Sequence, residues 1–215
     1  MQRIERVKGD ILFQPKEFIL GSKIIDIDIS RDNLLEFQKI MDSADIKFTL
    51  AYGTLLGAIR ENNFIVHDED IDVAILDEDR DNFLNILDNF LNNGFSIGRY
   101  ADDILSLIRN GEYIDIYIFR KKSFGYREFG NEKLKERYLI DTIEYNFIGS
   151  RFNIPKEFES YLIEHYGDSW RVPIKDYHAC NPNIYLRIKN FLKYNMKSVF
   201  NIISFIKQKV YVQNR

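Results

Sequence analysis

The stretch that decides the fold covers residues 67–76 and reads HDEDIDVAIL. Apolar and polar residues alternate along it, as they do in a strand with one buried face. One face carries Ile71, Val73 and Ile75, and the other carries Asp70, Asp72 and Ala74. Residues two apart on a strand lie about 6.6 Å apart and face the same side. Asp70 and Asp72 therefore converge on one space, and Asp68 joins them if the strand begins early.

Carboxylates held this close together repel one another strongly when they are partly shielded from water. Because the isoleucine face anchors the strand in a core, the cluster needs either protons or a bound cation. Oxygen-only ligands suit Mg²⁺ or Mn²⁺, which we expect as the cofactor. His67 is the one histidine nearby, which makes a zinc site less attractive. The plainer alternative is that these acidic residues form a solvated face.

A second carboxylate has the same apolar setting. Asp115 lies in an expected strand at 113–119, where it shares a face with Tyr113 and Tyr117. If the two strands are neighbours with matching faces, Asp115 joins Asp70 and Asp72 in one site. Such a site serves metal-assisted in-line displacement at phosphorus, where cations neutralise charge on the attacking and leaving oxygens.

The remaining patterns predict an α/β (α+β) fold, in which helices flank a small mixed sheet. Strands are expected at 48–52, 70–76, 104–108 and 113–119, and Asn110-Gly111 indicates a two-residue type I′ turn between the last two. Helices are expected from Ser30 with Asp32 at the start, and over 55–60, 83–91, 155–165 and much of 184–208. Gly94 is expected to cap the third helix, and Pro155 to occupy the first turn of the fourth.

Composition and charge limit the classes of protein that fit. The single cysteine, Cys180, excludes an internal disulfide, and no stretch is apolar enough for a signal peptide or a membrane span. Of the 30 basic residues seven follow Asp176, where no acidic residue occurs, so 23 basic residues face 33 acidic ones in 1–176. We expect a catalytic domain at 1–180, a basic amphipathic helical tail at 181–215 and a cytoplasmic location. The tail lies on the inner face of an anionic membrane, packs as an ordinary helix against the acidic body, or forms an oligomer contact. Its apolar content argues against binding of nucleic acid.

The segment 51–60, AYGTLLGAIR, passes from a strand into a helix. Gly53 permits close backbone approach, and Thr54 offers a hydroxyl and an N–H at the positive end of the helix, where phosphate binds well. Arg60 is a candidate for a charge-assisted contact with the same phosphates. Taken alone, a glycine at such a corner is usually only a turn.

Together with the aspartates, this segment resembles the signature of the LicD/fukutin-type transferases, which belong to the nucleotidyltransferase-fold superfamily. The resemblance rests on GTLLGAIR at 53–60, NFI at 63–65, DEDID at 68–72 and IDI at 114–116. A further element, YGDSWRVP at 166–173, is similar to one that closes such domains. The resemblance implies a nucleotidyltransferase-like sheet, a metal site and a CDP-activated donor.

Carried over by position, Asp70 and Asp72 become metal ligands, with Asp68 beside them. Asp115 becomes the third carboxylate, either a ligand or the base that orients the acceptor hydroxyl. Gly53, Thr54 and Arg60 would hold donor phosphates. The sequence departs from the family's pattern at two positions. His67 stands where tryptophan is frequent, and Glu69 where a middle aspartate is usual, and both departures bear on donor selectivity. His67 is either a donor contact or an uninvolved histidine at the edge of the strand.

Two residues near 170 are further candidates for the donor site. Trp170 could stack on a nucleobase and Arg171 could bind a phosphate, although a tryptophan beside a proline is more often a packing anchor. His165 and His178 could assist proton transfer, but the sequence places no carboxylate beside either. Cys180 has nothing to activate its thiol.

The function expected from the resemblance is transfer of phosphocholine, or of an alditol phosphate such as ribitol phosphate, from a CDP-activated donor. The acceptor would be a sugar hydroxyl on a cell-surface glycan or lipid-linked glycan, of the capsule, teichoic acid or lipopolysaccharide type. One alternative is a nucleotidyltransferase that moves NMP from an NTP and releases pyrophosphate. A second alternative is a non-catalytic nucleotide-binding protein of the same fold.

Overall fold

The computed structural model describes residues 1–16, 24–101 and 103–173. Chain contacts divide the protein into two units, Met1–Arg171 and Val172–Arg215, and of the second unit only Val172 and Pro173 are described. The expected helix at 184–208 lies outside the described residues, and the boundary at 180 stays a prediction. No helix in the described part of the chain combines the length and the apolar character needed to cross a membrane.

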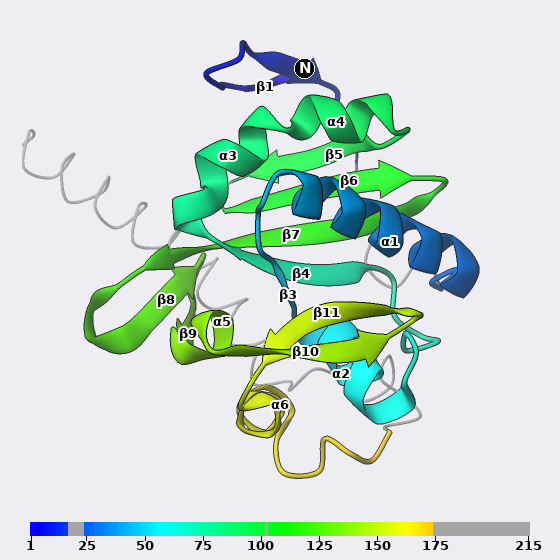
Figure 1. The fold of residues 1–215 in the computed structure, drawn as a ribbon, viewed down its shortest axis with the longest axis vertical. Coiled ribbons are helices and arrows are strands. Elements are labelled where there is room, and N and C mark those ends of the chain that lie inside the picture. The colour runs from blue at the N-terminus through cyan, green and yellow to red at the C-terminus, as the bar shows by residue number, and fades with distance from the viewer. Residues whose placement is uncertain (17–23, 102, 174–215) are drawn as a thin grey trace, which may run out of the picture. The chain divides into compact units, whose positions relative to one another are not determined.

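The first unit contains a nine-stranded mixed sheet, a small separate hairpin and helices (Figure 1). The separate hairpin pairs β1 (Gln2–Ile4) with β2 (Ile11–Phe13). The strands of the large sheet are β3 (Thr49–Leu50), β4 (Ile71–Leu76), β5 (Ser96–Ala101), β6 (Ile104–Arg109), β7 (Glu112–Lys121), β8 (Tyr126–Phe129), β9 (Glu132–Lys135), β10 (Thr142–Phe147) and β11 (Ser150–Pro155). The strand order is β10-β11-β3-β4-β7-β6-β5, with β8 and β9 continuing from β7. The prediction of a mixed sheet flanked by helices is confirmed, and the sheet is larger than expected.

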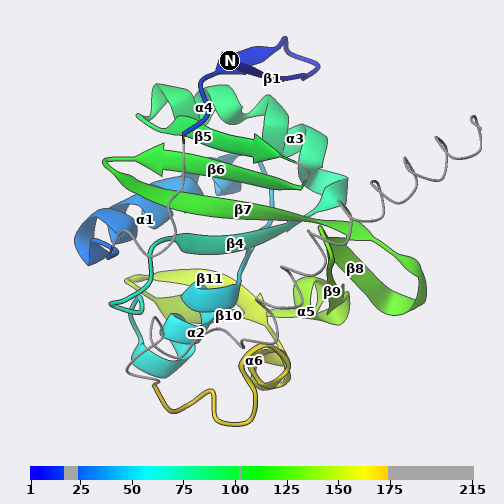
Figure 2. The same cartoon turned by 180° about the vertical axis from the view of Figure 1, so that it is seen from behind.

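The helices lie on both faces of this sheet. They are α1 (Ile27–Ser43), α2 (Tyr52–Glu61), α3 (Arg80–Asn85), α4 (Leu87–Asn92), α5 (Arg137–Ile140) and α6 (Phe158–Tyr166), with 3₁₀ turns at Asp77–Asp79 and Ser123–Gly125. In Figure 1, α1, α3 and α4 cover the near face of β4 to β7. Figure 2 views the sheet from behind, where α2 lies in front of β10 and β11.

The core lies between the sheet and α1. Ile71, Val73 and Ile75 of β4 are buried, as are Ile114, Ile116 and Ile118 of β7. On α1 the ring of Phe37 lies 5.2 Å from that of Phe90 in α4, which joins the two helices above these isoleucines. Burying this face stabilises the sheet and leaves the alternate side chains of β4 and β7 on the opposite face.

Several predicted boundaries change. Helix α1 begins before Ser30, because the side chain of extended Asp26 accepts two backbone N–H bonds and caps the helix there. The third expected helix is divided into α3 and α4 at Ile86. Pro155 does not begin a helix: it ends β11 opposite Thr142, and α6 starts at Phe158. The type I′ turn is confirmed, since Asn110 and Gly111 both have positive φ between β6 and β7.

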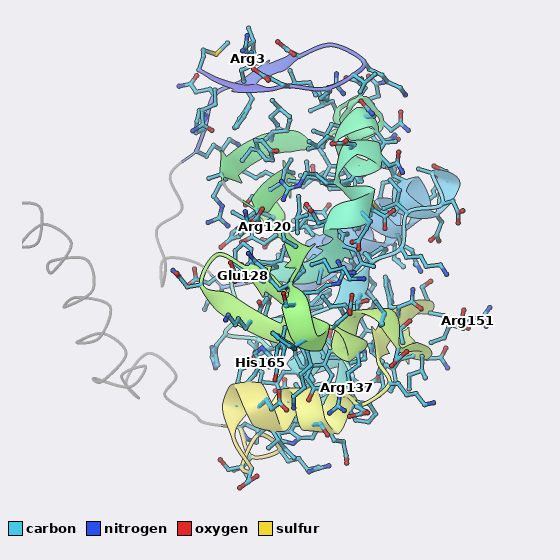
Figure 3. The ribbon with its side chains drawn as sticks, turned by 90° about the vertical axis from the view of Figure 1, so that its left-hand side faces the viewer. Arg3, Arg120, Glu128, Arg137, Arg151 and His165 are labelled. Atoms are coloured by element: carbon cyan, nitrogen blue, oxygen red, sulfur yellow. The ribbon has the colours of Figure 1, made fainter. Side chains whose placement is uncertain are left out.

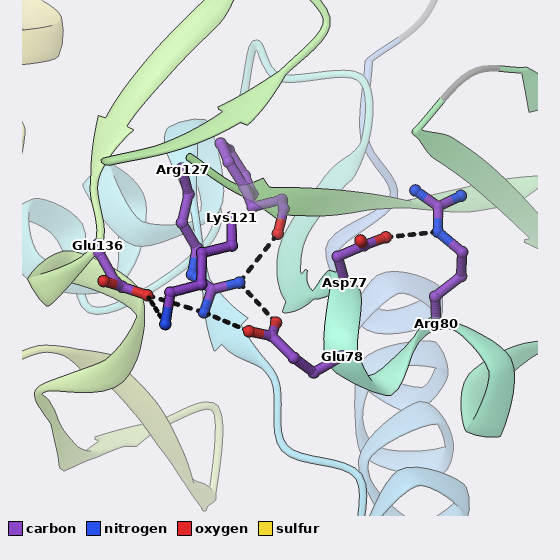
Figure 4. A network of polar contacts seen from close by, with 7 residues as sticks. Asp77, Glu78, Arg80, Lys121, Arg127 and Glu136 are labelled. Carbon is purple, nitrogen blue, oxygen red and sulfur yellow. Dashed lines mark hydrogen bonds and ion pairs between the residues drawn. The ribbon is translucent and has the colours of Figure 1, made fainter. Parts of the chain in front are cut away.

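A buried arginine joins β8 to two other elements (Figure 4). Arg127 is 2% exposed and donates to both carboxylate oxygens of Glu78 at 2.6 and 2.8 Å. It also donates to Glu136 at 2.9 Å and to the Phe119 carbonyl at 3.3 Å. The hydrogen bond from Arg127 is the main cause that lowers the pKa of Glu78 to about 2. The β8–β9 hairpin is thereby fixed to the rest of the unit.

We predict that Arg127→Ala lowers the free energy of unfolding by about 3 kcal/mol at pH 7, because it removes the cation from a buried ion-pair network. Glu78 stabilises the fold above its unfolded pKa of about 4.5, and this contribution is lost as the pH falls towards 2. The difference between wild type and variant should therefore shrink over that range in urea denaturation.

The control is Arg151→Ala: Arg151 and its partner Glu144 are both exposed, so this change should cost less than about 1 kcal/mol. Figure 3 shows Arg151 on the outside of the molecule. Equal costs for the two variants would contradict the assigned importance of Arg127.

Candidate functional site

Strand pairing brings two of the predicted aspartates side by side. β4 and β7 run parallel, and the register places Asp72 directly opposite Asp115. Asp70 precedes β4 by one residue, so it faces the same side as Asp72 two residues later. This side is opposite to the one that the buried isoleucines and α1 occupy. Three carboxylates from two strands thus gather on one face of the sheet.

Asp72 is 5% exposed and receives a hydrogen bond on each carboxylate oxygen. The backbone N–H of Gly53 donates to its Oδ2 at 3.0 Å, and the Tyr117 hydroxyl donates to its Oδ1 at 3.0 Å. The Asp72 backbone N–H in turn donates to the Thr54 hydroxyl at 2.8 Å. The first turn of α2 is therefore attached to β4 at the carboxylate cluster.

Gly53 is required by close approach of the aspartates. A Cβ atom added at this position would lie 2.2 Å from an Asp68 carboxylate oxygen and 3.3 Å from Asp72 Oδ2. Because glycine has no side chain, the carboxylates of Asp68 and Asp72 can lie directly against the backbone at this position. Thr54 is 1% exposed and its hydroxyl is engaged by Asp72, so both residues contact the carboxylates in the structure. Their predicted contact with donor phosphates stays a prediction.

Asp115 has a cationic neighbour. Arg99 on β5 donates to its Oδ2 at 2.5 Å, and Ser106 on β6 donates to its Oδ1. By contrast, no lysine or arginine of the described residues forms a salt bridge with Asp68, Asp70 or Asp72. The ion pair with a cation is therefore at Asp115, although the charge of Arg99 also opposes the rise in the pKa of Asp70.

Burial raises the pKa of all four aspartates, and repulsion from neighbouring carboxylates adds to the rise at Asp68, Asp70 and Asp72. Burial is the largest cause for each of them. The pKa of Asp70 rises to about 8, with Asp115, Asp68 and Glu69 adding to the effect, and the pKa of Asp68 rises to about 6. The pKa of Asp72 rises well above its usual range, and Arg99 and Ser106 oppose the rise at Asp115. The cluster favours protons or a cation over free carboxylates.

The donor chemistry fits Mg²⁺ or Mn²⁺, because the available ligands are carboxylate oxygens without a cationic partner on β4. The side chains are not already arranged as a finished ligand set. Over the described parts of the chain, no three His, Cys, Asp or Glu side chains stand close enough to hold an ion together.

A second group of predicted residues lies at the other end of α2. Arg60 donates to the Trp170 carbonyl at 3.3 Å and to Glu61 at 2.6 Å. Trp170 is 4% exposed, and the Arg171 guanidinium lies 4.3 Å from its ring while bonding Glu159. Arg60 lies seven positions after Gly53 on α2, which is a rise of about 10 Å. The structure does not bring this group together with the aspartates.

His67, by contrast, is exposed in the connection between α2 and β4. The donor-binding roles of His67, Arg60, Trp170 and Arg171 stay predictions. The burial of Trp170 agrees with the alternative reading of this residue as a packing anchor.

Sequence reasoning missed several residues around Asp72 and Asp115. Tyr117 had a signal, because it lies two residues after Asp115 on the same face. Ser106 also had one, since the two-residue turn at Asn110-Gly111 places it opposite Asp115. Arg99 had none, because β5 was not predicted.

Comparison with known proteins agrees with the resemblance stated above. The family model described as LicD/FKTN/FKRP, nucleotidyltransferase domain, matches residues 45–157. This is a little over half of the chain and includes Gly53, Asp70, Asp72 and Asp115. The family resemblance is confirmed.

Curated relatives include an uncharacterised protein of Rickettsia typhi, 30% identical over 114 residues, which cover 51% of this chain and 36% of that protein. The ribitol-5-phosphate transferase FKTN of Homo sapiens is 26% identical over 159 residues, which cover 68% of this chain and 34% of that protein. The chain thus spans about a third of the length of these relatives.

Among solved structures, the lincosamide antibiotic adenylyltransferase LnuA, lincomycin-bound, is 15% identical with a TM-score of 0.47, over 65% of this chain and 87% of that one. ANT(2″)-Ia in complex with adenylyl-2″-tobramycin is 13% identical with a TM-score of 0.49, over 73% of this chain and 83% of that one.

We predict that Asp70→Asn raises the free energy of unfolding by about 1 kcal/mol when no divalent cation is present. The pKa of Asp70 is raised in the folded state, so the ionised carboxylate costs stability at every pH above its unfolded pKa of about 4. The neutral amide removes this cost, and thermal unfolding in a chelator should show a melting temperature about 2–4 °C higher.

Asp141→Asn is the matched control, because Asp141 is exposed and lies outside the cluster. It should leave the melting temperature unchanged. A lower melting temperature for Asp70→Asn than for wild type would contradict the repulsion argued here.

Proposed function

Because the chain belongs to the LicD/FKTN/FKRP nucleotidyltransferase domain family, we propose that it moves a phospho-substituent from a CDP-activated donor to a sugar hydroxyl. The acceptor would be a cell-surface glycan or a lipid-linked precursor of one. The observation that carries this proposal is the register of β4 and β7, which sets Asp72 against Asp115 with Asp70 on the same face. Phosphoryl transfer depends on positioning and on neutralising negative charge, and clustered carboxylates serve both through a cation.

In this proposal, Asp70 and Asp72 hold Mg²⁺ or Mn²⁺, with Asp68 beside them and Asp115 as the third carboxylate. The cation would neutralise charge on the phosphate oxygens of the donor. Gly53 and Tyr117 keep the Asp72 carboxylate oriented by donating to its two oxygens. Gly53 also leaves room for Asp68 to approach the backbone.

Asp115 has a separate part in the proposal. Arg99 and Ser106 hold both of its oxygens, so its carboxylate is fixed in place on β7. It serves either as a ligand or as the proton acceptor that orients the attacking sugar hydroxyl. In the second role the proton of the hydroxyl would pass to a carboxylate oxygen of Asp115 as the oxygen attacks phosphorus.

The transferred group is proposed to be phosphocholine or an alditol phosphate. The name of the human relative, a ribitol-5-phosphate transferase, supports keeping ribitol phosphate in this set. Transfer of NMP from an NTP remains the second candidate, because the matching domain is described as a nucleotidyltransferase domain. The two reactions differ in the phosphorus attacked, and they release CMP and pyrophosphate respectively.

We predict that the protein, incubated with Mg²⁺ or Mn²⁺ and a panel of CDP-choline, CDP-glycerol, CDP-ribitol and nucleoside triphosphates, releases CMP from one CDP donor. Asp72→Asn should lower this turnover by at least about 100-fold, since the charge that holds the cation is lost. Circular dichroism should show that the variant keeps the fold.

The exposed Asp141→Asn serves again as the control and should retain wild-type turnover. Pyrophosphate in place of CMP would support the second candidate. Undiminished turnover in Asp72→Asn, or turnover without a divalent cation, would contradict the proposed mechanism.

A further inference from the structure

The residue just before Gly53 has an unusual backbone conformation. Tyr52 opens α2 with a φ of 41°, in the left-handed region that non-glycine residues rarely enter. A bulky side chain is strained in this conformation, which persists only where neighbouring groups fix it. The groups that fix Tyr52 come from α6 and from the β8–β9 hairpin, far along the chain.

Tyr52 is held at both of its polar groups. Its backbone N–H donates to the Tyr161 hydroxyl of α6 at 3.2 Å. Its own hydroxyl donates to Oε2 of Glu132, the first residue of β9, at 2.8 Å. Tyr161 is 1% exposed, so the first of these contacts is shielded from water.

Glu132 is in turn paired with His165. The Nε2 atom of His165 lies 3.0 Å from Glu132 Oε1, and its Nδ1 atom lies 2.9 Å from the Tyr161 carbonyl oxygen. A carbonyl only accepts, so Nδ1 carries a hydrogen. The contact between Nε2 and the carboxylate then requires one shared proton, because two bare lone pairs would repel. Figure 3 shows His165 between α6 and the β8–β9 hairpin.

The imidazole of His165 is also fixed by rings. It stacks on Tyr161 at 4.1 Å between ring centroids and meets the edge of Tyr52 at 5.6 Å. His165, Glu132, Tyr161 and Tyr52 therefore form one packed group, which we call the Tyr52 clamp. None of its four members belongs to the carboxylate cluster.

The Tyr52 clamp reaches Asp72 by two routes. The Tyr52 ring packs edge-on against Tyr117 at 4.8 Å, and the Tyr117 hydroxyl donates to Asp72 Oδ1. Gly53 follows Tyr52 in the chain, and its N–H donates to Asp72 Oδ2. Both donors that orient the Asp72 carboxylate thus adjoin Tyr52.

We propose that Glu132 and His165 are positioning residues, which hold Tyr52 in its strained conformation and thereby orient the Asp72 carboxylate. Neither residue touches the carboxylates of the site, and both act through Tyr52. The effect on turnover rests on the proposed function, whereas the effect on the Gly53 hydrogen bond does not.

The first test is the amide proton of Gly53 in an ¹H–¹⁵N correlation spectrum, which reports its hydrogen bond to Asp72 without substrate or metal. Glu132→Ala removes the acceptor of the Tyr52 hydroxyl and should move this resonance upfield. Tyr138→Phe is the matched control: Tyr138 is buried against Tyr161, and its hydroxyl bonds Glu164 on α6, so the same helix loses a similar contact. The control should leave Gly53 unmoved.

The second test is kinetic. Glu132→Ala and Tyr52→Phe should each lower kcat by about 10- to 100-fold with little change in KM, since a small misplacement of a catalytic group costs that much. The double variant should have the same kcat as Glu132→Ala alone, because both changes break the same hydrogen bond between Tyr52 and Glu132. His165→Gln, whose amide can still donate to Glu132, should retain more activity than His165→Leu.

The outcomes separate the two proposals. If Glu132→Ala and His165→Leu leave the Gly53 resonance where it is in folded protein, the positioning role is wrong even if the enzyme turns over. If the wild type turns over no donor but the Gly53 resonance moves as expected, the proposed function is wrong and the positioning of Asp72 holds. If Glu132→Ala does not fold, Tyr52→Phe and His165→Gln decide the kinetic test.

Discussion

The parallel pairing of β4 with β7 is the constraint on which the rest of the site depends. Backbone hydrogen bonds fix Asp72 opposite Asp115, and the buried isoleucines on the other face prevent either strand from turning. The negatively charged carboxylates are therefore held together by backbone hydrogen bonds and apolar packing, in which the carboxylates take no part. The hydrophobic burial of that face stabilises a local arrangement that electrostatics alone opposes.

The negative charge of this cluster is compensated differently on β7 and on β4. Asp115 on β7 is neutralised by the guanidinium of Arg99 and is held in orientation by the hydroxyl of Ser106. On β4 the contacts of Asp72 are neutral donors, a backbone N–H and a phenol, which orient a carboxylate without neutralising its charge. The β4 carboxylates thus keep their capacity to bind a cation, while Asp115 on β7 is already paired and fixed. Such a site is suited to bind a cation beside a fixed carboxylate. The buried Tyr161 and the half-buried Tyr52 lie beside these neutral donors.

Much of this arrangement could be predicted from the sequence, because it rests on short-range patterns. Alternation at 70–76 and 113–119 identified the two strands and the faces of their aspartates, and Asn110-Gly111 set the register between β6 and β7. The edge strand β10 was not predicted, although Ile143, Tyr145 and Phe147 alternate with polar residues along it. The β8–β9 hairpin shows no such alternation, because the buried residue of β8 is Arg127. The contact of Glu132 with His165 joins residues far apart in the chain, and no periodic signal predicts it. Arg60 shares α2 with Gly53, but the helix between them keeps apart two residues that the motif joins in sequence.

The central claim is that the carboxylates of β4 gather to hold a divalent cation. Anomalous X-ray diffraction from crystals of the protein grown with Mn²⁺ tests this most directly, because it locates the ion without any assumption about the reaction. We expect an anomalous peak that places the ion within bonding distance of carboxylate oxygens of Asp70 and Asp72. A well-ordered site without such a peak, or an ion bound only elsewhere, would contradict it.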